Sequence, residues 1–315
     1  MLNAWKEFRR SKGSKKDIQQ FEFKLEDNIF QLQKSLQNGS YQHGPYQKFL
    51  VYDPKPRTIH KAGVRDRLLH QAVYRKLYQI FDPHFIFDSY SCRRKKGVHR
   101  AINQLESFIK KVSANYHQPV YVLKCDVRKF FDSIDQRILF HLIQKKVRDL
   151  EALNLIRLIL KSFELTPGKG LPLGNATSQL FSNIYLNELD QFVKHQIKAK
   201  YYLRYCDDFV VVHHDPVYLK SLIEPINLFL QKKLNLTLHP NKISIRKLRQ
   251  GIDYLGYVTL PHFRVLRTKT KQRILKKKNA GKIDEKNLPS YLGMLKHCRG
   301  RKITENFWQP PLSPV

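Results

Sequence analysis

Three aspartates that lie far apart along the chain have the residue type and spacing for metal-assisted chemistry. Asp126 ends a β-rich run at residues 120–127, and Asp207 and Asp208 lie between the β-rich runs 201–205 and 209–212. If these runs are neighbours in one antiparallel sheet, the carboxylates converge at one end of it. Converging carboxylates repel one another and need cations, and hard oxygen ligands select Mg²⁺ or Mn²⁺, two of which can catalyse phosphoryl transfer. Taken alone, the Asp207-Asp208 pair is more simply explained as turn residues, because Asp is common in turns.

The charge of the chain indicates a polyanionic partner. There are 58 Lys and Arg residues against 26 Asp and Glu, a formal net charge of +32. The last 54 residues carry 14 Lys and Arg against three acids. Interleaved Tyr and Phe residues, 16 and 19 in all, offer stacking surfaces for bases. Nucleic acid is therefore the favoured partner, and the alternatives are a solubilising basic surface or contact with an anionic membrane leaflet.

Several classes of protein are disfavoured by the composition. The four cysteines lie far apart, with no C-x-x-C pair and no zinc spacing, which suits a reducing cytoplasm. The N-terminus lacks the apolar stretch of a signal peptide, and the longest purely apolar run, residues 209–212, cannot span a bilayer. The sequence therefore predicts a cytoplasmic protein without a membrane partner.

Hydrophobic periodicity predicts the elements that must position the acids. The first 40 residues read as one amphipathic helix, followed by turns and short strands over 41–59 and by helices over 64–81 and 98–111. Strand 120–127 places Leu123 and Cys125 on one face and Val122 and Lys124 on the other. Helices are expected over 135–163 and from Ser178 onward, around a Pro/Gly-rich loop at 166–174. The two runs that flank Asp207-Asp208 predict a hairpin with the acids in its turn.

The acids stand within a set of ordered motifs that resembles the reverse transcriptases. Residues 205–208, Tyr-Cys-Asp-Asp, resemble the YxDD box of that family, and residues 126–131 resemble its first palm motif. Residues 173–179, Leu-Gly-Asn-Ala-Thr-Ser-Gln, are similar to the second palm motif. Asn241-Lys242 and residues 254–257 look like the later lysine motif and the primer grip. The resemblance covers about residues 45–260.

This resemblance implies RNA-directed DNA polymerase activity on an α+β fold, a right hand with an antiparallel-sheet palm. It places the fingers at 1–115, the palm at 116–260, with 136–170 possibly shared with the fingers, and a short basic helical thumb at 261–315. Asp126, Asp207 and Asp208 become the catalytic residues and the ligands of two Mg²⁺ ions, for which Mn²⁺ could substitute. Asp132 and Asp135 are expected to cap the following helix, and Ser178 to cap its own.

The resemblance also implies which residues bind the incoming dNTP. Phe131 takes the place of the sugar gate, where a large ring excludes a ribose 2′-hydroxyl; the alternative is an ordinary core residue. Lys242 could protonate or hold the leaving pyrophosphate, or be a plain surface lysine. Lys and Arg near residue 56 would hold the triphosphate. The expected dNTP-binding residues are Lys55, Arg57, Phe131, Gly174, Gln179 and Lys242.

The template and primer contacts are expected on basic and aromatic segments. Arg65 and Arg67 could touch template phosphate or form a local salt bridge, and loop 93–96 could grip the backbone or be merely solvated. The Lys triplet at 276–278 suits phosphate or a protein partner. His213-His214 and His297-Cys298 are treated as structural. The expected nucleic-acid-binding residues are Arg65, Arg67, Arg93, Arg94, Lys95, Lys96, Tyr254, Gly256, Tyr257, Lys276, Lys277 and Lys278.

Leu173 and Gln179 indicate which branch of the family the sequence resembles most. Intron-type relatives carry Gln before the glycine and Pro at the end of this motif, whereas the Leu-Gly-x-x-x-Ser-Gln pattern resembles reverse transcriptases of diversity-generating retroelements, which copy a template repeat with errors at adenine. The implied partners are an RNA template, a DNA or RNA primer, dNTPs and a small accessory protein. Reverse transcriptases of a group II intron, a retron or a phage-defence system are the alternatives, and a non-catalytic RNA-binding protein on a palm scaffold is the alternative of another class.

Overall fold

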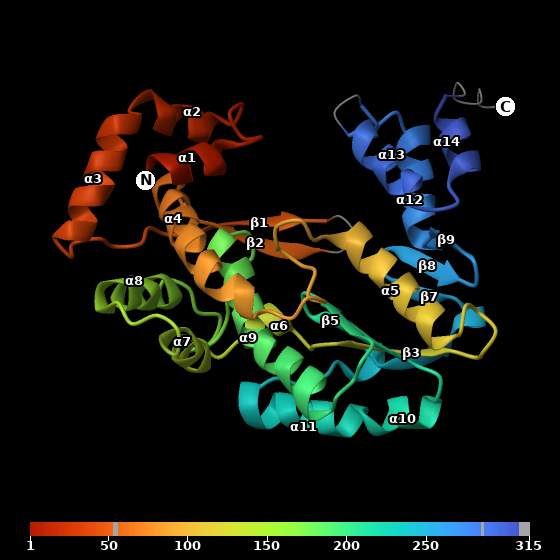
Figure 1. Ribbon diagram of the computed structural model, residues 1–315. Helices are drawn as coiled ribbons and strands as arrows, with labels where there is room; N and C mark the ends of the chain where they lie inside the picture. Colours follow the sequence, from red (N-terminus) through yellow and green to blue (C-terminus); the bar gives the residue numbers. More distant parts are fainter. Residues whose placement is uncertain (53–55, 285–286, 309–315) are drawn as a thin grey trace.

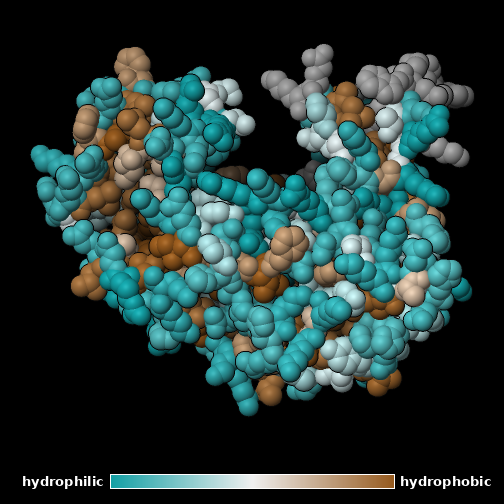
Figure 2. Space-filling view, viewed as in Figure 1, coloured by the Kyte–Doolittle hydropathy of each residue, from teal (hydrophilic) through white to brown (hydrophobic). Residues whose placement is uncertain are grey.

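The computed structural model describes residues 1–52, 56–284 and 287–308. Two groups of helices rise from a central body of sheets and helices, one formed by α1–α3 and the other by α12–α14 (Figure 1). The surface is deeply hollowed between these two groups, and hydrophilic side chains line much of the hollow in this view (Figure 2). Among the described residues, no helix is both long and apolar enough to cross a membrane.

The N-terminal group consists of α1 (Leu2–Arg9), α2 (Lys16–Phe23) and α3 (Leu25–Gln37). The prediction of one long helix was wrong, because the backbone leaves the helical region at Ser11, with φ 58°, and at Lys24, with ψ 44°. Breaking the helix lets Trp5, Ile18 and Leu32 turn toward a common centre, where they pack with Leu68 and neighbouring residues of the long helix α4 (Val64–Phe81). The apolar periodicity was read correctly, but it belongs to separate helices.

A strand hairpin and two long helices connect this group to the central body. Strands β1 (Gln47–Val51) and β2 (Arg57–Lys61) pair antiparallel. After α4 come a 3-10 turn, η1 (Asp82–His84), and α5 (Val98–Val112). Helices α4 and α5 lie where the periodicity predicts them.

The central sheet is four-stranded and antiparallel within the described residues, with the order β4-β5-β3-β6. Its strands are β3 (Tyr121–Asp126), β4 (Tyr202–Tyr205), β5 (Asp208–His213) and β6 (Ser244–Lys247). The predicted alternation is confirmed: Leu123 and Cys125 face the large core formed with the helices below, whereas Val122 faces the core formed with α5. The helices that follow β3 in the chain are α6 (Phe130–Ser133), α7 (Gln136–Gln144), α8 (Leu150–Lys161), α9 (Ala176–Gln191) with the π-helix η2 (Phe192–Gln196), α10 (Pro216–Ser221) and α11 (Ile223–Leu234).

A second sheet carries the C-terminal helices. After the 3-10 turns η3 (Pro240–Lys242) and η4 (Leu248–Gln250), the strands β7 (Ile252–Tyr254), β8 (Tyr257–Leu260) and β9 (Phe263–Leu266) pair in sequence order. Helices α12 (Thr268–Asn279), α13 (Leu288–Lys296) and α14 (Arg301–Trp308) follow. Tyr257, Leu266, Ile274 and Leu295 form a small core with Ile102 of α5, which anchors this group on the central body.

A buried arginine ties α9 to the hairpin β4–β5. The guanidinium of Arg204 donates to both carboxylate oxygens of Asp190, at 2.7 and 2.6 Å, and both side chains have no exposed surface. It also donates to the amide oxygen of Asn183 and to the hydroxyl of Ser89. A charge in the interior is tolerated only when its hydrogen bonds are satisfied in this way.

The Asp190→Asn variant should therefore lose about 3–5 kcal/mol of unfolding free energy, because the change leaves a buried guanidinium without its counter-charge. Urea denaturation followed by circular dichroism measures this loss. The exposed Arg301–Glu305 pair provides the control, since Glu305→Gln should leave the unfolding midpoint unchanged. Equal midpoints for Asp190→Asn and the wild type would contradict the structural role of the pair.

Candidate active site

The three acids meet at one end of the central sheet. Asp126 is the last residue of β3 and Asp208 the first of β5, and they lie opposite each other in the antiparallel register. Asp207 is in the turn before Asp208, and its carbonyl accepts a hydrogen bond from the backbone of Val127 at 3.3 Å. The sequence prediction that the carboxylates converge is therefore supported by the backbone register, which sets their spacing.

The turn that carries Asp207 is held from both sides. Cys206 adopts a left-handed conformation, with φ 56°, so the chain reverses tightly between β4 and β5. Arg204 donates to the carbonyl of Cys206 at 2.9 Å. From the second sheet, the hydroxyl of Tyr254 donates to the carbonyl of Asp208 at 3.2 Å. The acid turn is thus fixed by hydrogen bonds to its carbonyls.

Burial and nearby negative charge make Asp207 and Asp208 hard to ionise. The pKa of Asp207 is raised, first by burial and then by the charge of Asp126. The pKa of Asp208 rises to about 6, mainly through burial; Asp207 and Asp126 also raise it, whereas Lys124 opposes the shift. The site therefore favours an added positive charge.

A lysine already supplies one such charge. Lys242, at the end of η3, places its Nζ 2.7 Å from Oδ1 of Asp126. Its side chain is 41% exposed, so the ammonium group reaches the acids from the solvent side. This contact brings the lysine motif to the carboxylates, and the role of Lys242 at the pyrophosphate stays a prediction.

The donor atoms suit a hard divalent cation, but the described residues hold no preassembled metal cluster. The three carboxylates supply only oxygen ligands, which Mg²⁺ prefers. Among the residues that the structure describes, no group of three or more His, Cys, Asp or Glu side chains is placed to hold a metal ion. Lys242 occupies one oxygen of Asp126. Metal binding by all three acids would therefore require these side chains to rearrange.

A cleft of about 870 Å³ opens in front of the acids. On the central body its walls include Arg57, Phe131 and Leu173 next to Asp207 and Asp208. The ring of Phe131 lines the cleft and meets Phe130 edge-on at 5.3 Å, and Phe130 is the deeply buried member of the pair. Phe131 therefore lies beside the acids while also packing against the core, and its role as a gate stays a prediction. The facing wall comes from the second sheet and α12, with Leu255, Gly256, Arg267, Lys269 and Arg273.

Three other predicted dNTP contacts, Gly174, Gln179 and Lys242, are not among the described residues that line this cleft. Gly174 lies in a different, smaller pocket with Asn175, and its φ of 112° together with Ile59 Cγ2, 3.1 Å from where a Cβ would stand, requires glycine there. Gln179 is exposed on α9. Lys55 lies outside the described residues.

The predicted caps were right in one of three positions. Asp135 caps α7 by accepting from the backbone of Arg137 and Ile138. Asp132 instead lies within α6, and Ser178 is buried in the first turns of α9, whose N-cap is Asn175. Asp132 and Ser178 do not cap a helix because α6 and α9 begin before these residues, at Phe130 and Ala176.

Several predicted nucleic-acid contacts are engaged within the protein. Arg93 is 8% exposed and binds Asp82 at 2.6 Å and the carbonyls of Ile86 and Ser89, so it orders its own loop. Arg67 pairs with Asp17 at 2.6 Å. Arg65, more exposed, pairs with Asp66, so the local salt bridge that the sequence left open is present.

Other members of the predicted set keep solvent-facing surface. Arg94 and Lys95 are exposed, whereas Lys96 donates to the carbonyl of Phe87 and covers its ring. In the last turn of α12, Lys276 is exposed and Lys277 and Lys278 are half-buried.

The two tyrosines of the expected primer grip are buried and hold the protein together, so their side chains do not face a ligand. Tyr254 and Tyr257 are each 1% exposed, and Tyr257 donates to the carbonyl of Met294. Leu255 and Gly256 form the turn between them, with φ of 49° and 90°, and it is this turn that borders the cleft. Any contact of this motif with a ligand must therefore come from the turn.

Sequence reasoning missed Arg204 and the cations of α12. A charged residue in the middle of the β-rich run 201–205 was the available signal for a buried, paired arginine. Arg267, Lys269 and Arg273 were counted only within the basic C-terminal segment, and nothing in their spacing indicated that they face the acids.

Comparison with known proteins agrees with this geometry. Residues 53–259 match the family model described as reverse transcriptase (RNA-dependent DNA polymerase). The protein YkfC of Escherichia coli K12 is 25% identical over 268 residues, which cover 72% of this chain and 69% of YkfC. The group II intron-encoded protein LtrA of Lactococcus lactis is 29% identical over 185 residues, covering 56% of this chain but only 30% of LtrA.

Solved structures show the same fold at low sequence identity. Telomerase from Candida albicans, in complex with a fragment of telomeric RNA, superposes with a TM-score of 0.51 at 12% identity, covering 76% of this chain and 51% of the telomerase. Apo telomerase from Candida tropicalis gives a TM-score of 0.52 at 12% identity over 72% of this chain and 49% of the telomerase. The α+β right-hand polymerase fold expected from the sequence is confirmed.

The raised pKa of Asp208 predicts a pH-dependent effect of removing its charge. Between about pH 4 and 6 the folded protein retains a proton on Asp208 that the unfolded chain has lost, so the wild type loses stability as pH rises through this window. Asp208→Asn abolishes this loss. Its unfolding free energy relative to wild type should therefore increase by about 2 kcal/mol from pH 4 to pH 7 in urea titrations without divalent ions. A difference that stays constant with pH would contradict this account of the site.

Proposed function

Because the chain belongs to the reverse transcriptase (RNA-dependent DNA polymerase) family, we propose that it copies RNA into DNA at Asp126, Asp207 and Asp208. The observation that carries this proposal is the register of β3 and β5, which brings Asp126 opposite Asp208, a residue that lines the cleft together with Asp207. A chain with a net charge of +32 is suited to a polyanionic substrate, and the adjacent carboxylates of Asp207 and Asp208 suit the cations that accompany such a substrate.

In this proposal the three aspartates would hold two Mg²⁺ ions, or Mn²⁺ in their place. Such ions, when bound, activate the primer 3′-hydroxyl and neutralise the charge of the leaving pyrophosphate. Arg57 and Phe131 line the cleft. In the proposal, the guanidinium of Arg57 would bind the triphosphate, and the ring of Phe131 would exclude a ribose 2′-hydroxyl and so select dNTPs. Lys242 holds protons on Nζ beside Asp126, where one can pass to the pyrophosphate.

The nucleic acid would lie across the hollow between the two groups of helices. We assign residues 1–115 to fingers, 116–260 to palm and 261–315 to thumb, with the turn at 255–256 beside the primer end and the basic face of α12 on the duplex. An RNA template and a DNA or RNA primer are the proposed partners. Arg93, Tyr254 and Tyr257 act in this scheme as supports. A cytoplasmic location and a small accessory protein remain predictions from the sequence.

Two branches of the family are supported by different observations. The relative LtrA is described as group II intron-encoded, which favours an intron-type enzyme. The sequence pattern of Leu173 to Gln179 favours the error-prone enzyme of a diversity-generating retroelement, and Leu173 lines the cleft, where a branched apolar side chain offers no hydrogen bond to the nascent base pair.

Asp207→Asn and Asp208→Asn test the catalytic proposal. Each variant should reduce primer extension on an RNA template with dNTPs and Mg²⁺ by at least about 10³-fold, since each removes a negative ligand of the activating ions. Circular dichroism and RNA binding serve as the control for folding. Extension that survives both changes refutes the assignment, and RNA binding without extension by the wild type identifies a non-catalytic binding protein.

Leu173→Gln tests the branch. If the apolar residue loosens base discrimination, the variant should misincorporate several-fold less often opposite template adenine, as measured by sequencing of extension products. The matched control is Leu165→Gln, an exposed leucine away from the residues that line the cleft. An unchanged error spectrum would contradict the proposed link between Leu173 and infidelity.

A further inference from the structure

A second, smaller cavity lies behind the loop that carries Leu173 and Gly174. Its volume is about 230 Å³, and it is enclosed by the α1–α2 connection, the β1–β2 hairpin, α4 and the beginning of α9. The backbone of His60 in β2 donates to the carbonyl of Leu173 at 3.1 Å, which fixes the loop between this cavity and the catalytic cleft. The described linings of the two spaces have no residue in common.

The cavity carries an excess of positive charge. Lys12, Lys15, Lys61 and Arg67 line it, and no Asp or Glu is among the described residues of its lining. Asp17, which lies outside the lining, binds Lys61 and Arg67 at 2.6 Å each. Lys12 donates to the carbonyl of Phe8 at 2.9 Å and pairs with no carboxylate within the part of the chain that the structure describes. Burial lowers the pKa of Lys12, and the charges of Arg67 and Lys15 lower it further. An anion in the cavity would relieve this repulsion.

An unusual helix start points into the same space. Asn175 is the N-cap of α9, a helix of 16 residues, yet its side chain makes no capping hydrogen bond. The residue is 2% exposed, and both the oxygen and the nitrogen of its amide lack a partner within the described part of the chain. A buried amide without partners costs about 1–3 kcal/mol, so this arrangement calls for a ligand. The positive end of the helix dipole favours an anionic one.

We propose that this cavity is a binding site for a phosphate group, separate from the catalytic cleft. The Asn175 amide and the first backbone N–H groups of α9 bind its oxygens, and Lys12 and Lys15 neutralise its charge. The rings of Phe8 and Phe49 line the cavity as well and offer an apolar surface to an attached ribose or base. The phosphate belongs either to single-stranded RNA or to a free nucleotide.

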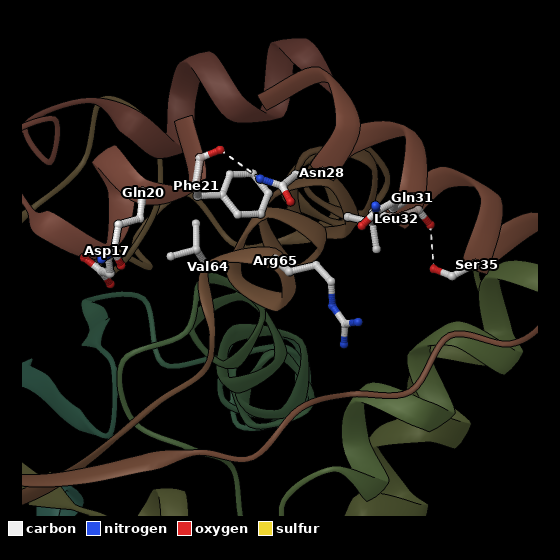
Figure 3. Close-up of a pocket in the computed structure, with 9 residues that line it drawn as sticks. All are labelled: Asp17, Gln20, Phe21, Asn28, Gln31, Leu32, Ser35, Val64 and Arg65. Carbon is white, nitrogen blue, oxygen red and sulfur yellow. Dashed lines mark hydrogen bonds between the residues drawn. The ribbon is translucent and has the colours of Figure 1, made fainter. Parts of the chain in front are cut away.

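A neighbouring pocket serves as the contrast. It measures about 510 Å³, lies between α2, α3 and the beginning of α4, and includes Asp17 and Arg65 (Figure 3). Its buried polar groups have partners: the amide of Asn28 donates to the carbonyl of Phe21 at 2.9 Å, and Ser35 donates to that of Leu32 at 2.8 Å. Nothing in this pocket calls for an anion, so it offers sites for control substitutions.

Asn175→Asp separates phosphate binding from helix capping. An aspartate has the same shape and is at least as good an N-cap, so the melting temperature should be kept or raised, but its charge repels phosphate. Lys12→Gln is the second variant, which tests the site even if the first fails to fold. The matched controls are Gln31→Glu in the neighbouring pocket and Lys233→Gln on the exposed face of α11, which make the same changes in charge.

The full chain is titrated, without dNTPs or Mg²⁺, with a primer–template that has a single-stranded RNA overhang, with its blunt counterpart, and with AMP. Asn175→Asp and Lys12→Gln should each weaken binding on the order of tenfold relative to their controls. A loss confined to the overhang identifies RNA as the source of the phosphate, and a loss for AMP identifies a free nucleotide. Affinities equal to those of the controls for all probes overturn the proposal. Because no synthesis is measured, this outcome is independent of the polymerase proposal.

Discussion

The guanidinium of Arg204 is the group on which the arrangement of the acids depends most directly. From a position with no exposed surface it binds Asp190 of α9, Ser89 of the preceding loop and the carbonyl of Cys206 in the acid turn. Removing Asp190 would leave a charge in the interior, and the other partners satisfy the remaining N–H groups, so the three segments are tied together at this side chain. The sheet register then sets Asp126 opposite Asp208.

Two lysines, Lys124 and Lys242, partly neutralise the negative charge of the aspartates. Burial raises the pKa of Asp207 and of Asp208, while Lys124 acts in the opposite direction and Lys242 pairs with Asp126. This arrangement is only partly neutralised in a chain whose other surfaces are strongly basic. The three aspartates thus form a negatively charged site on a positively charged protein. Such a site favours ligands that carry divalent cations together with negative phosphates.

The sequence predicted what depends on local pattern and failed where tertiary contacts decide. The β-rich runs around Asp207-Asp208 and the alternation of Leu123 with Val122 were sufficient for the hairpin, the two faces of β3 and the meeting of the acids. The break at Lys24 was not visible, because the apolar spacing continues across it while the backbone turns toward α4. The same limitation applies to Arg93 and Tyr257, whose residue types suit nucleic acid but whose neighbours in space occupy them. Asn175 belongs to a recognisable motif, yet the side of the loop that it faces is set by β2.

The hydrogen bond from Tyr254 to the carbonyl of Asp208 joins the two sheets at the residue that carries one of the catalytic-site carboxylates. Tyr254 ends β7, directly before the turn at 255–256 that borders the cleft, and β8 continues from that turn toward the C-terminal helices. Lys124 of β3 joins the same two sheets by donating to the carbonyl of Asp253 in β7 at 3.1 Å. The strand that leads to the C-terminal helices is thus bonded to the strands that carry the acids, so a substitution at Tyr254 would disturb the carboxylates although this side chain does not reach the cleft.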